Sequence, residues 1–554
     1  MTAHPSATAP PVPAPAPAAA RVPAASAADA DAPGNLAAHL AALAERRGWS
    51  DRAAFHQSHQ GHRSWTHGEV HELAARTATV LARHGVGPGD RVILALPDGI
   101  TWVTVFLATA RLGAVAVLVN PELPPADHAF MTEDAEAVLC VTGPGLEEGE
   151  RETGVREGGA GGLRGEAVRG GRFAGRPLLG ADQLAALAPT AEPATTAHPV
   201  DAHTPLYVQY TSGTTGRPKG VVHCHGDPKT YHDLIGRRLL RITQDDVTLS
   251  VSKLYFAYGF GNAFVFPLFS GSSAVLVDRR PAPAAVDELV ARHRVTLLYS
   301  VPSAYAALVA DRGTGHQACF ASVRAAVSAG EGLPDGLGQQ VGELLGAPVL
   351  EQIGSTEAGH AFCANSLDHN HPGTVGRPVP GFEVELRDRA GLPLSGADEG
   401  AEGELWVRGP TVTSGYLNRP EETARSLVGG WLATRDRAVR EPDGTYRHLG
   451  RADDMEMVGG ITVSPLEVEA VLRTHPAVKE VAVAALTDER GFSRLRAFVV
   501  PAGPPRTGLE TELIELAQAR LAAFKVPRSV SFVPTLPRTS TGKLRRHLVR
   551  QGAW

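Results

Sequence analysis

The sequence predicts an α/β fold built on parallel sheets, followed by a second and smaller α/β domain. Helical and β-rich runs alternate after residue 35, as in chains of strand–helix–strand units. The pattern of the sequence changes near residue 450, where charged residues and paired glycines appear, and about 100 residues remain beyond that point. At 554 residues the chain is also far longer than the roughly 100–200 residues of one typical domain. Apolar residues make up 43% of it, which is enough for more than one buried core.

The elements of the large domain follow in order from Asn35. Leu36, Leu40 and Leu43 recur at helical spacing and predict a first helix. An amphipathic helix, a buried strand, a second helix and two further strands are then predicted, over residues 65–85, 91–97, 101–113, 114–120 and 137–143.

Composition divides the chain further. Residues 1–33 are rich in Ala and Pro, which predicts a disordered tail. Residues 144–178 are rich in Gly, Arg and Glu and poor in apolar residues, which predicts a solvated, mobile loop. This loop interrupts a large domain at 34–449. A hinge at 450–453 and a small domain at 454–554 complete the predicted organisation.

The small domain is predicted from its own elements. Ser464 and Pro465 mark the start of a helix, and Glu467 stands three residues after the serine as a capping-box partner. Two strands and a helix are then predicted, over 478–486, 494–500 and 509–524.

Charge and composition exclude several classes of function. The formal net charge of -6 offers no basic surface to nucleic acid. No apolar run reaches the ~18 residues of a membrane helix, and the first residues lack the apolar segment of a secretory signal. We therefore expect a soluble cytoplasmic protein. The cysteines show neither CxxC nor Cys/His ligand spacing, so free thiols are expected at Cys140, Cys224, Cys319 and Cys363.

Residues 210–220, YTSGTTGRPKG, combine hydroxyl side chains with glycines and end beside a lysine. Glycine lets backbone N–H groups approach anionic oxygens closely, so the loop suits a triphosphate. The P-loop pattern is excluded by spacing, because Lys219 follows Gly216 by three residues and precedes another glycine. The β-rich run at 206–212 leads into the loop, and a polar loop that follows a buried strand is a common ligand site.

The same stretch resembles the phosphate-binding signature of the adenylate-forming superfamily, which contains acyl-CoA synthetases, luciferases and the adenylation domains of peptide synthetases. The segment SKLYFAYGFGNAFVFPL at 252–268 is most similar to benzoate–CoA ligases and other aryl-CoA ligases. The resemblance covers residues 35–550 apart from the Gly/Arg-rich loop. It implies a distorted barrel beside the parallel sheets and a mobile C-terminal lid. Four further family motifs stand in order: EQIGSTEAGH (351–360), TRDRAVREPDG (434–444), GRADDMEMVGG (450–460) and PRTSTGKLRR (537–546).

The resemblance implies two half-reactions. The carboxylate of an acid attacks the α-phosphorus of ATP, which gives an acyl-adenylate and pyrophosphate. A thiol, usually that of CoA, then displaces AMP. The protein contributes positioning and charge neutralisation to the first step. ATP, Mg²⁺ and CoA are the small molecules implied.

The phosphate end of the predicted site comes from two motifs. By resemblance, Lys219 places a positive charge near the phosphates, and Glu357 binds Mg²⁺ together with Thr214, because this hard cation prefers oxygen ligands. Thr356 reaches the α-phosphate. The phosphate loop and the nucleotide wall are completed by Thr211, Ser212, Gly213, Thr215, Gly216, Gly330, Glu331, Ile353, Gly354 and Ser355.

The ribose and the reacting atoms are assigned to later motifs. Asp436 is implied to accept hydrogen bonds from both ribose hydroxyls, with Arg451 as the adjacent donor. Arg435 departs from the family pattern, which usually has Gly there, and its longer side chain is expected to alter exposure of the site. Lys543 is implied to bridge the attacking carboxylate and the α-phosphate, so that Lys543, Glu357 and Thr356 are the expected catalytic residues. Loss of a preorganised cation of this kind costs at least ~10²–10³ in rate.

The second half-reaction depends on the hinge and its surroundings. Asp453 takes the place of the hinge residue about which the C-terminal domain rotates. Gly459 and Gly460 resemble the backbone-lined approach for the pantetheine arm of CoA. Met457 stands where relatives commonly have Lys, which leaves the identity of the thiol acceptor in doubt.

The pocket for the acid is also assigned by resemblance. Tyr258 can pack against a flat ring, and neighbouring glycine leaves room for the ring edge. His360 either packs in the core or contacts a ring substituent; with a reference pKa of about 6.5 it could donate a hydrogen bond to a hydroxyl or amine. Benzoate is therefore the default substrate, with hydroxy- and aminobenzoates as rivals. The implied walls are Ala257, Tyr258, Gly259, Gly330, Ile353 and His360.

Three alternatives remain from sequence. The aryl group could be passed to CoA, to the phosphopantetheine of a carrier protein, or, with an aminobenzoate-type substrate, to a nitrogen acceptor. A non-catalytic homologue is disfavoured because the assigned ATP-site residues are intact. A monomer or a homodimer is expected.

Overall fold

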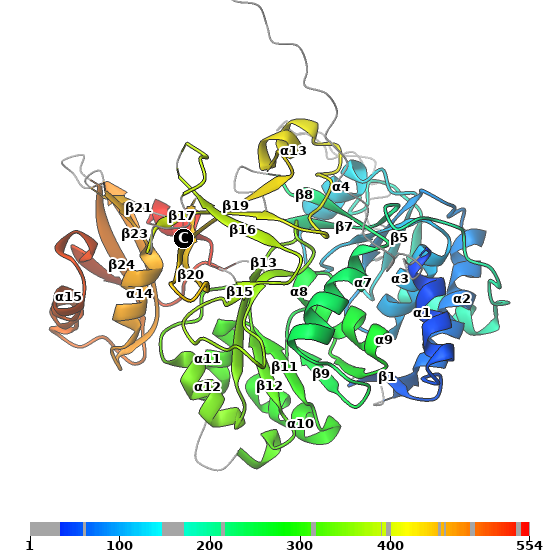
Figure 1. Cartoon of the computed structure of the whole chain (residues 1–554), viewed down its shortest axis with the longest axis horizontal. Coiled ribbons are helices and arrows are strands. Elements are labelled where there is room, and N and C mark those ends of the chain that lie inside the picture. The colour runs from blue at the N-terminus through cyan, green and yellow to red at the C-terminus, as the bar shows by residue number, and fades with distance from the viewer. Residues whose placement is uncertain are drawn as a thin grey trace, which may run out of the picture. The chain divides into compact units, whose positions relative to one another are not determined.

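The computed structural model describes residues 34–58, 63–146, 171–211, 217–311, 317–388, 390–394, 400–452, 456–458, 461–487, 493–538 and 544–552. Figure 1 shows how the described elements are arranged. The predicted tail at 1–33 lies outside these ranges. Within them, no helix is long and apolar enough to cross a membrane.

Six of the described strands form a first sheet, in the order β6-β5-β3-β4-β7-β8. The first five run parallel, and β8 pairs antiparallel with β7. The parallel strands are apolar on both faces because both faces are covered. Their bounds are Arg91–Ala95 (β3), Val115–Leu118 (β4), Leu139–Thr142 (β5), Leu178–Gly180 (β6), Pro205–Thr211 (β7) and Lys219–Cys224 (β8).

Nine described strands form a second sheet, in the order β15-β14-β13-β12-β11-β9-β10-β1-β2. Its centre is parallel and its ends are antiparallel. Alternate residues of one strand enter different cores: Leu297 and Tyr299 join one, and Leu298 joins the other. The bounds are Ala53–Gln57 (β1), Ser64–Thr66 (β2), Val247–Ser250 (β9), Ser273–Leu276 (β10), Leu297–Ser300 (β11), Ala325–Ser328 (β12), Val349–Gly354 (β13), Ala361–Ala364 (β14) and Arg377–Pro378 (β15).

The helices of the large domain begin where the sequence provides caps. Asn35 caps α1 by accepting from the N–H groups of Ala37 and Ala38, and Thr66 forms a capping box with Glu69 at the start of α2. The bounds are Leu36–Arg46 (α1), His67–Arg83 (α2), Ile100–Arg111 (α3), Pro125–Asp134 (α4), Ala181–Leu187 (α6), Asp227–Tyr231 (α7), Ala257–Phe260 (α8), Phe266–Ser270 (α9), Pro283–His293 (α10), Pro302–Ala310 (α11), Leu337–Leu345 (α12) and Pro420–Ser426 (α13), with π-helices at His232–Leu239 and Gly261–Val265.

A third, antiparallel sheet of the described chain corresponds to the expected distorted barrel. It contains β16 (Glu383–Arg387), β17 (Glu402–Arg408), β18 (Leu427–Val428), β19 (Trp431–Arg440) and β20 (Tyr446–Arg451). Mixed α/β architecture with parallel sheets and a small C-terminal part confirms the predicted fold class. The four cysteines, all among the described residues, form no disulfide, as expected.

The C-terminal part has its own apolar core, formed around Val468, Val483 and Leu513. The predicted capping box is wrong: the Ser464 hydroxyl donates 2.6 Å to the Leu449 carbonyl, and Glu467 pairs with Lys525 instead. The bounds are Glu456–Val458 (β21), Ile461–Val463 (β22), Pro465–Arg473 (α14), Val478–Thr487 (β23), Ser493–Pro501 (β24), Leu509–Arg520 (α15), Ser529–Phe532 (β25) and Arg546–Gln551 (α16).

The predicted loop at 144–178 is only partly a loop. Residues 147–170 lie outside the described ranges, but Phe173 is fully buried in the core of the first sheet. Its ring stacks on His128, with centroids 5.2 Å apart. Leu178 then begins β6. One aromatic residue thus anchors the end of a segment that composition alone assigns to solvent.

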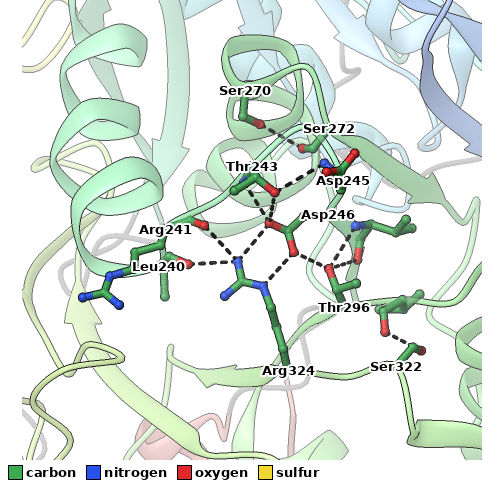
Figure 2. Close-up of polar contacts among 12 residues, drawn as sticks. Leu240, Arg241, Thr243, Asp245, Asp246, Ser270, Ser272, Thr296, Ser322 and Arg324 are labelled. Atoms are coloured by element: carbon green, nitrogen blue, oxygen red, sulfur yellow. Dashed lines mark hydrogen bonds and ion pairs between the residues drawn. The ribbon is translucent and has the colours of Figure 1, made fainter.

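A buried ion pair joins three neighbouring strands of the nine-stranded sheet where they begin (Figure 2). Asp246 precedes β9, and Arg324 precedes β12. The Asp246 carboxylate accepts hydrogen bonds of 2.7 and 3.0 Å from the Arg324 guanidinium. Thr296, before β11, donates to the same carboxylate at 2.7 Å, and so does the Thr243 N–H at 2.8 Å. Burial alone would raise the pKa of Asp246, but Arg324 and these hydrogen bonds lower it on balance.

We expect Asp246→Ala to lower the free energy of unfolding by about 2–4 kcal/mol at pH 7, because the partly buried Arg324 loses its partner. Since the pKa of Asp246 is lowered in the folded state, this stabilisation is complete above the unfolded pKa of about 4 and is lost as pH falls through the folded value. Urea unfolding at several pH values measures both effects.

Glu136→Ala is the matched control, because Glu136, which pairs with Arg91 at 3.0 Å, is 69% exposed where Asp246 is 5% exposed. Its expected cost is below about 1 kcal/mol. Equal losses for the two variants, or a loss at Asp246 that does not change between pH 7 and pH 3, would contradict the assignment.

Candidate active site

The predicted ATP-binding residues follow the carboxyl ends of strands in both large sheets. Thr211 is the last residue of β7, and Gly330 comes two residues after the end of β12. Ile353 and Gly354 close β13, and Glu357 lies in the turn after it. Ligands in open α/β sheets bind outside the carboxyl ends of strands, so this placement is the one a nucleotide site requires.

The phosphate loop connects two opposed strand ends. Thr211 pairs with Lys219, and Tyr210 with Gly220, in the antiparallel β7–β8 register. A Cβ at Gly220 would lie 2.8 Å from a Val208 methyl, so this glycine is required by packing. The loop residues between the strands, Ser212, Gly213, Thr214, Thr215 and Gly216, lie outside the described ranges, and their phosphate contacts stay predictions.

The chain reverses sharply between β13 and β14. The antiparallel register shifts at Ile353 and Gly354, and a Cβ at Gly354 would overlap the carbonyl of His360. Glycine is therefore needed for the turn that presents Thr356 and Glu357. His223, fully buried on β8, holds this turn by a 2.7 Å hydrogen bond from Nε2 to the Thr356 carbonyl.

Glu357 and Lys219 are brought together by a residue that the sequence analysis did not single out. The hydroxyl of Tyr416 donates 2.9 Å to Oε1 of Glu357. The Lys219 ammonium lies 5.2 Å from the centroid of the same ring and 3.4 Å from Oε1 of Glu422. The Glu357 carboxylate thus contacts the hydroxyl of Tyr416, and the Lys219 ammonium lies over its ring, at the end of the site assigned to the phosphates.

The ribose residues face each other across two strands. Asp436 on β19 and Arg451 on β20 are Cα partners, and His448 Nε2 donates 3.2 Å to Oδ1 of Asp436. Asp436 is only 6% exposed. Burial alone would raise its pKa, but His448 and the charge of Arg451 lower it on balance. An ionised, buried carboxylate of this kind is suited to accept two hydroxyl donors.

A second buried carboxyl group supports the loop that carries Gly330 and Glu331. Glu351 on β13 accepts a 3.3 Å hydrogen bond from the Leu333 N–H. Burial raises the pKa of Glu351 to about 7, against smaller opposing contributions from that bond and from His448. Gly330 adopts φ +89°, which favours glycine, and it is exposed at the edge of the site.

The predicted acid pocket has a well-packed aromatic wall. Tyr258 donates 3.0 Å to the Val327 carbonyl, and its ring centroid lies 6.1 Å from that of His360. Ile353 is 8% exposed beside them. A Cβ at Gly259 would overlap the Lys253 carbonyl, so close backbone packing requires this glycine. Room for a ring edge at Gly259, and the lining role of Ala257, stay predictions.

His360 is a neutral core histidine. It is 3% exposed, and burial lowers its pKa to about 3. Its Nε2 donates 3.1 Å to Oδ1 of Asn262, so Nδ1 carries a lone pair. That nitrogen has no partner within the described residues. His360 thus packs and hydrogen-bonds in the core, which was one of the two roles expected for it, and its contact with a ring substituent stays a prediction.

Several assigned residues of the hinge and lid lie outside the described ranges. They are Asp453, Gly459, Gly460 and the lysine expected to bridge the reacting groups, Lys543. Met457, at the departure from the family pattern, is in β21. The roles of all five stay predictions.

Arg435 adopts φ +62° beside the ribose carboxylate. This left-handed conformation favours glycine, and it costs an L-residue roughly 1–2 kcal/mol. The strand pairing of β17 with β19 shifts register around this position. The glycine that the family usually places before the aspartate therefore has a conformational reason, and Arg435 occupies the same backbone geometry at a cost.

Comparisons with known proteins extend over almost the whole chain. A family model described as AMP-binding enzyme matches residues 42–417, and one described as AMP-binding enzyme C-terminal domain matches residues 467–543. A p-hydroxybenzoic acid–AMP ligase of Mycobacterium tuberculosis is 39% identical over 525 residues, which are 94% of this chain and 69% of the relative. The benzoate–CoA ligase of Thauera aromatica is 37% identical over 496 residues, which are 88% of this chain and 90% of the relative.

Solved structures agree in fold. A benzoate CoA ligase from Burkholderia xenovorans superimposes with a TM-score of 0.83 at 34% identity, over 93% of this chain and 99% of that one. The anthranilate CoA ligase AuaEII, solved with anthranoyl-AMP, gives a TM-score of 0.83 at 30% identity, over 93% and 97%.

We expect Arg435→Gly to raise the free energy of unfolding by about 0.5–1 kcal/mol, because relief of the left-handed strain outweighs the added freedom of the unfolded chain. Arg294→Gly is the matched control: this arginine is also exposed, has φ +52° and ends α10. Thermal unfolding compares the two. A gain at Arg294 with a loss at Arg435 would show that side-chain contacts of Arg435 outweigh its strain.

Proposed function

The chain belongs to the AMP-binding enzyme family, and on that basis we propose that it is an AMP-forming acid–thiol ligase of the benzoate–CoA ligase type. It would activate an aromatic carboxylic acid with ATP as an aryl-adenylate and pass the aryl group to CoA. One observation carries the proposal: within eight residues, the segment from Ile353 to His360 runs from the aromatic wall to Glu357 at the phosphate end. One turn thus carries residues assigned to the acid and a residue assigned to the phosphate end, which supports the proposal.

The residues divide the first half-reaction between them. Asp436 would hold the ribose, and Lys219 with the phosphate loop would hold the β- and γ-phosphates of the leaving group. Thr356 is assigned to the α-phosphate. Lys543 would stabilise the charge that develops as the acid carboxylate attacks the α-phosphorus. Pyrophosphate departs, and in the second step the CoA thiol attacks the acyl carbon while AMP leaves.

Glu357 fits the magnesium role. The Tyr416 hydrogen bond occupies one of the four lone-pair directions of its carboxylate, so others remain for a hard cation. Mg²⁺ held there would offset phosphate charge in the transition state. The protein's own part is to fix the orientation of that carboxylate.

A hydroxybenzoate is the substrate that the acid pocket favours. The unpaired Nδ1 of His360 can accept a hydrogen bond from a ring hydroxyl, and benzoate would leave that buried acceptor unmet. The similarity to a relative named for p-hydroxybenzoic acid supports the same choice.

Transfer to a carrier protein is the second candidate for the later step. The relative just named is an AMP ligase rather than a CoA ligase, and Met457 replaces the lysine that the family commonly has near its hinge. Both candidates share the adenylation step. An aminobenzoate is a further candidate acid, since an anthranilate–CoA ligase of Pseudomonas aeruginosa is 35% identical over 476 residues, while a nitrogen acceptor stays a prediction from sequence.

Mass spectrometry of the products from hydroxybenzoates, benzoate or anthranilate with ATP, Mg²⁺ and CoA tests the function. We expect an aryl-CoA and AMP with wild-type protein. Lys543→Ala is expected to slow adenylation at least ~10²–10³-fold. Lys525→Ala is the matched control, because Lys525 pairs with Glu467 on the same part of the chain.

An adenylate without a thioester would favour the carrier protein as acceptor. Unchanged adenylation by Lys543→Ala would contradict the catalytic assignment, and no adenylate from any of these acids would contradict the aromatic substrate class.

We expect His360→Leu to reduce the preference for the best hydroxybenzoate over benzoate by about 3–10-fold, the worth of one neutral hydrogen bond. Because burial lowers the pKa of His360 to about 3, its ring stays neutral above pH 5, and the wild-type preference should not vary between pH 6 and pH 8 on its account. The ratio of kcat/KM values for the two acids at each pH measures both effects.

His67→Leu is the control for loss of a buried histidine, since His67 is fully buried and contacts the Ser272 carbonyl. A preference unchanged in His360→Leu, or one that falls equally in both variants, would exclude His360 from substrate recognition.

A further inference from the structure

The segment between β17 and β18 is hydrogen-bonded to two parts of the site assigned to the phosphates, the turn that carries Glu357 and the strand β8. The Thr413 N–H donates 2.7 Å to the Glu357 carbonyl, and the Thr413 hydroxyl donates 2.7 Å to the Val222 carbonyl on β8. Four residues on, the Leu417 N–H donates 2.7 Å to the Gly220 carbonyl. This segment is thus bonded both to the turn that carries Glu357 and to the strand that begins with Lys219.

Tyr416 lies between these anchors, and its backbone bridges to Val221. Its hydroxyl makes the 2.9 Å bond to Glu357, while its ring faces the Lys219 ammonium at 5.2 Å. Lys219 has one further partner at 3.4 Å, Glu422 on α13. A single half-buried side chain therefore contacts the carboxylate assigned to the metal and the lysine assigned to the phosphates.

We propose that Tyr416 is a positioning residue for the metal-bound triphosphate: its hydroxyl fixes the orientation of the Glu357 carboxylate, and its ring fixes the place of the Lys219 ammonium. The inference rests on the proposed function for the roles of Glu357 and Lys219. The contacts of Tyr416 themselves are properties of the fold.

Physical chemistry gives the contact its effect. A hydroxyl that donates to a carboxylate forms a charge-assisted hydrogen bond, which is stronger and more directional than a neutral one. Burial and the neighbouring Glu357 carboxylate raise the pKa of Tyr416, so the hydroxyl keeps the proton it donates. The bond leaves the second carboxylate oxygen for a cation, and the ring attracts the lysine through its electron-rich face. Phenylalanine at this position keeps the ring and removes the hydroxyl, and with it the bond to Glu357 and the contact with Ser426.

The test compares Tyr416→Phe with Tyr446→Phe. Tyr446 is a buried tyrosine whose hydroxyl donates 3.1 Å to the Val384 carbonyl, so its variant loses a hydrogen bond away from Glu357 and Lys219. KM for MgATP and KM for the acid are measured separately. Binding of Mn²⁺ in the presence of α,β-methylene ATP is followed by electron paramagnetic resonance, a readout that requires no turnover.

In Tyr416→Phe we expect KM for MgATP to rise about 10-fold and Mn²⁺–nucleotide binding to weaken by a similar factor, since a bond to a charged group is worth at least that much. KM for the acid should change less than about twofold. In the background of Glu357→Gln the same substitution should have little further effect, because the two residues act through one contact. Tyr446→Phe should resemble wild type in all three measurements.

Unchanged nucleotide and Mn²⁺ binding in Tyr416→Phe would overturn the proposal. So would a fall in thermal stability with both KM values unchanged, or full additivity with Glu357→Gln, because each indicates a purely structural tyrosine. Failure of the proposed function is recognised separately: if no aromatic acid is adenylated, the Mn²⁺–nucleotide measurement still decides the role of Tyr416.

Discussion

The reversal of the chain after β13 is the constraint on which the rest of the site depends. A Cβ at Gly354 would overlap the His360 carbonyl, so the backbone can turn this tightly only with glycine. The turn sets Glu357 toward Tyr416 and His360 toward Asn262, and His223 fixes its centre through the Thr356 carbonyl. The sites predicted for the acid and for the phosphates are therefore coupled, because displacement of this turn would shift residues assigned to both.

The buried titratable groups around the turn differ in charge state. Their hydrogen-bond and charge partners decide whether burial favours the neutral form of each group. His360 is paired only with a neutral amide, so burial keeps it uncharged. Glu351 receives one backbone N–H, and its pKa rises to about 7. Asp436 is as buried as Glu351, yet His448 and Arg451 lower its pKa. Of the two carboxyl groups, the one predicted to bind a polar ligand is the one held in its charged form.

Sequence motifs predict the site residues, because phosphate and ribose chemistry restricts residue type, and the structure pairs some of these motif positions. Asp436 lies opposite Arg451 on the neighbouring strand, and Thr211 lies opposite Lys219. In each pair, strand pairing brings two motif residues together. Tyr416 lies in no motif that was used, since its role depends on a contact with Glu357 across 59 positions.

Local patterns also failed where tertiary contacts competed with them. Ser464 has a capping-box sequence, but its hydroxyl bonds to Leu449 instead. Phe173 lies in a Gly- and Arg-rich stretch and is buried through a contact with His128 that composition cannot indicate. Only the position of Arg435 had a usable signal: the departure from the expected glycine marks a left-handed backbone conformation.

The two half-reactions place different demands on the chain, and the comparisons reflect this. A relative named as an AMP ligase and one named as a CoA ligase are 39% and 37% identical to this protein, although their names differ in the step after adenylation. Adenylation is assigned to the buried Asp436, to the half-buried Glu357 and to the aromatic wall, which packs against the main apolar core of the large domain. The acceptor, by contrast, is assigned to a few positions near the hinge, where substitution leaves this core intact. We therefore expect a change of acceptor to disturb this core less than a change of acid, and Met457 is among the positions assigned to the acceptor.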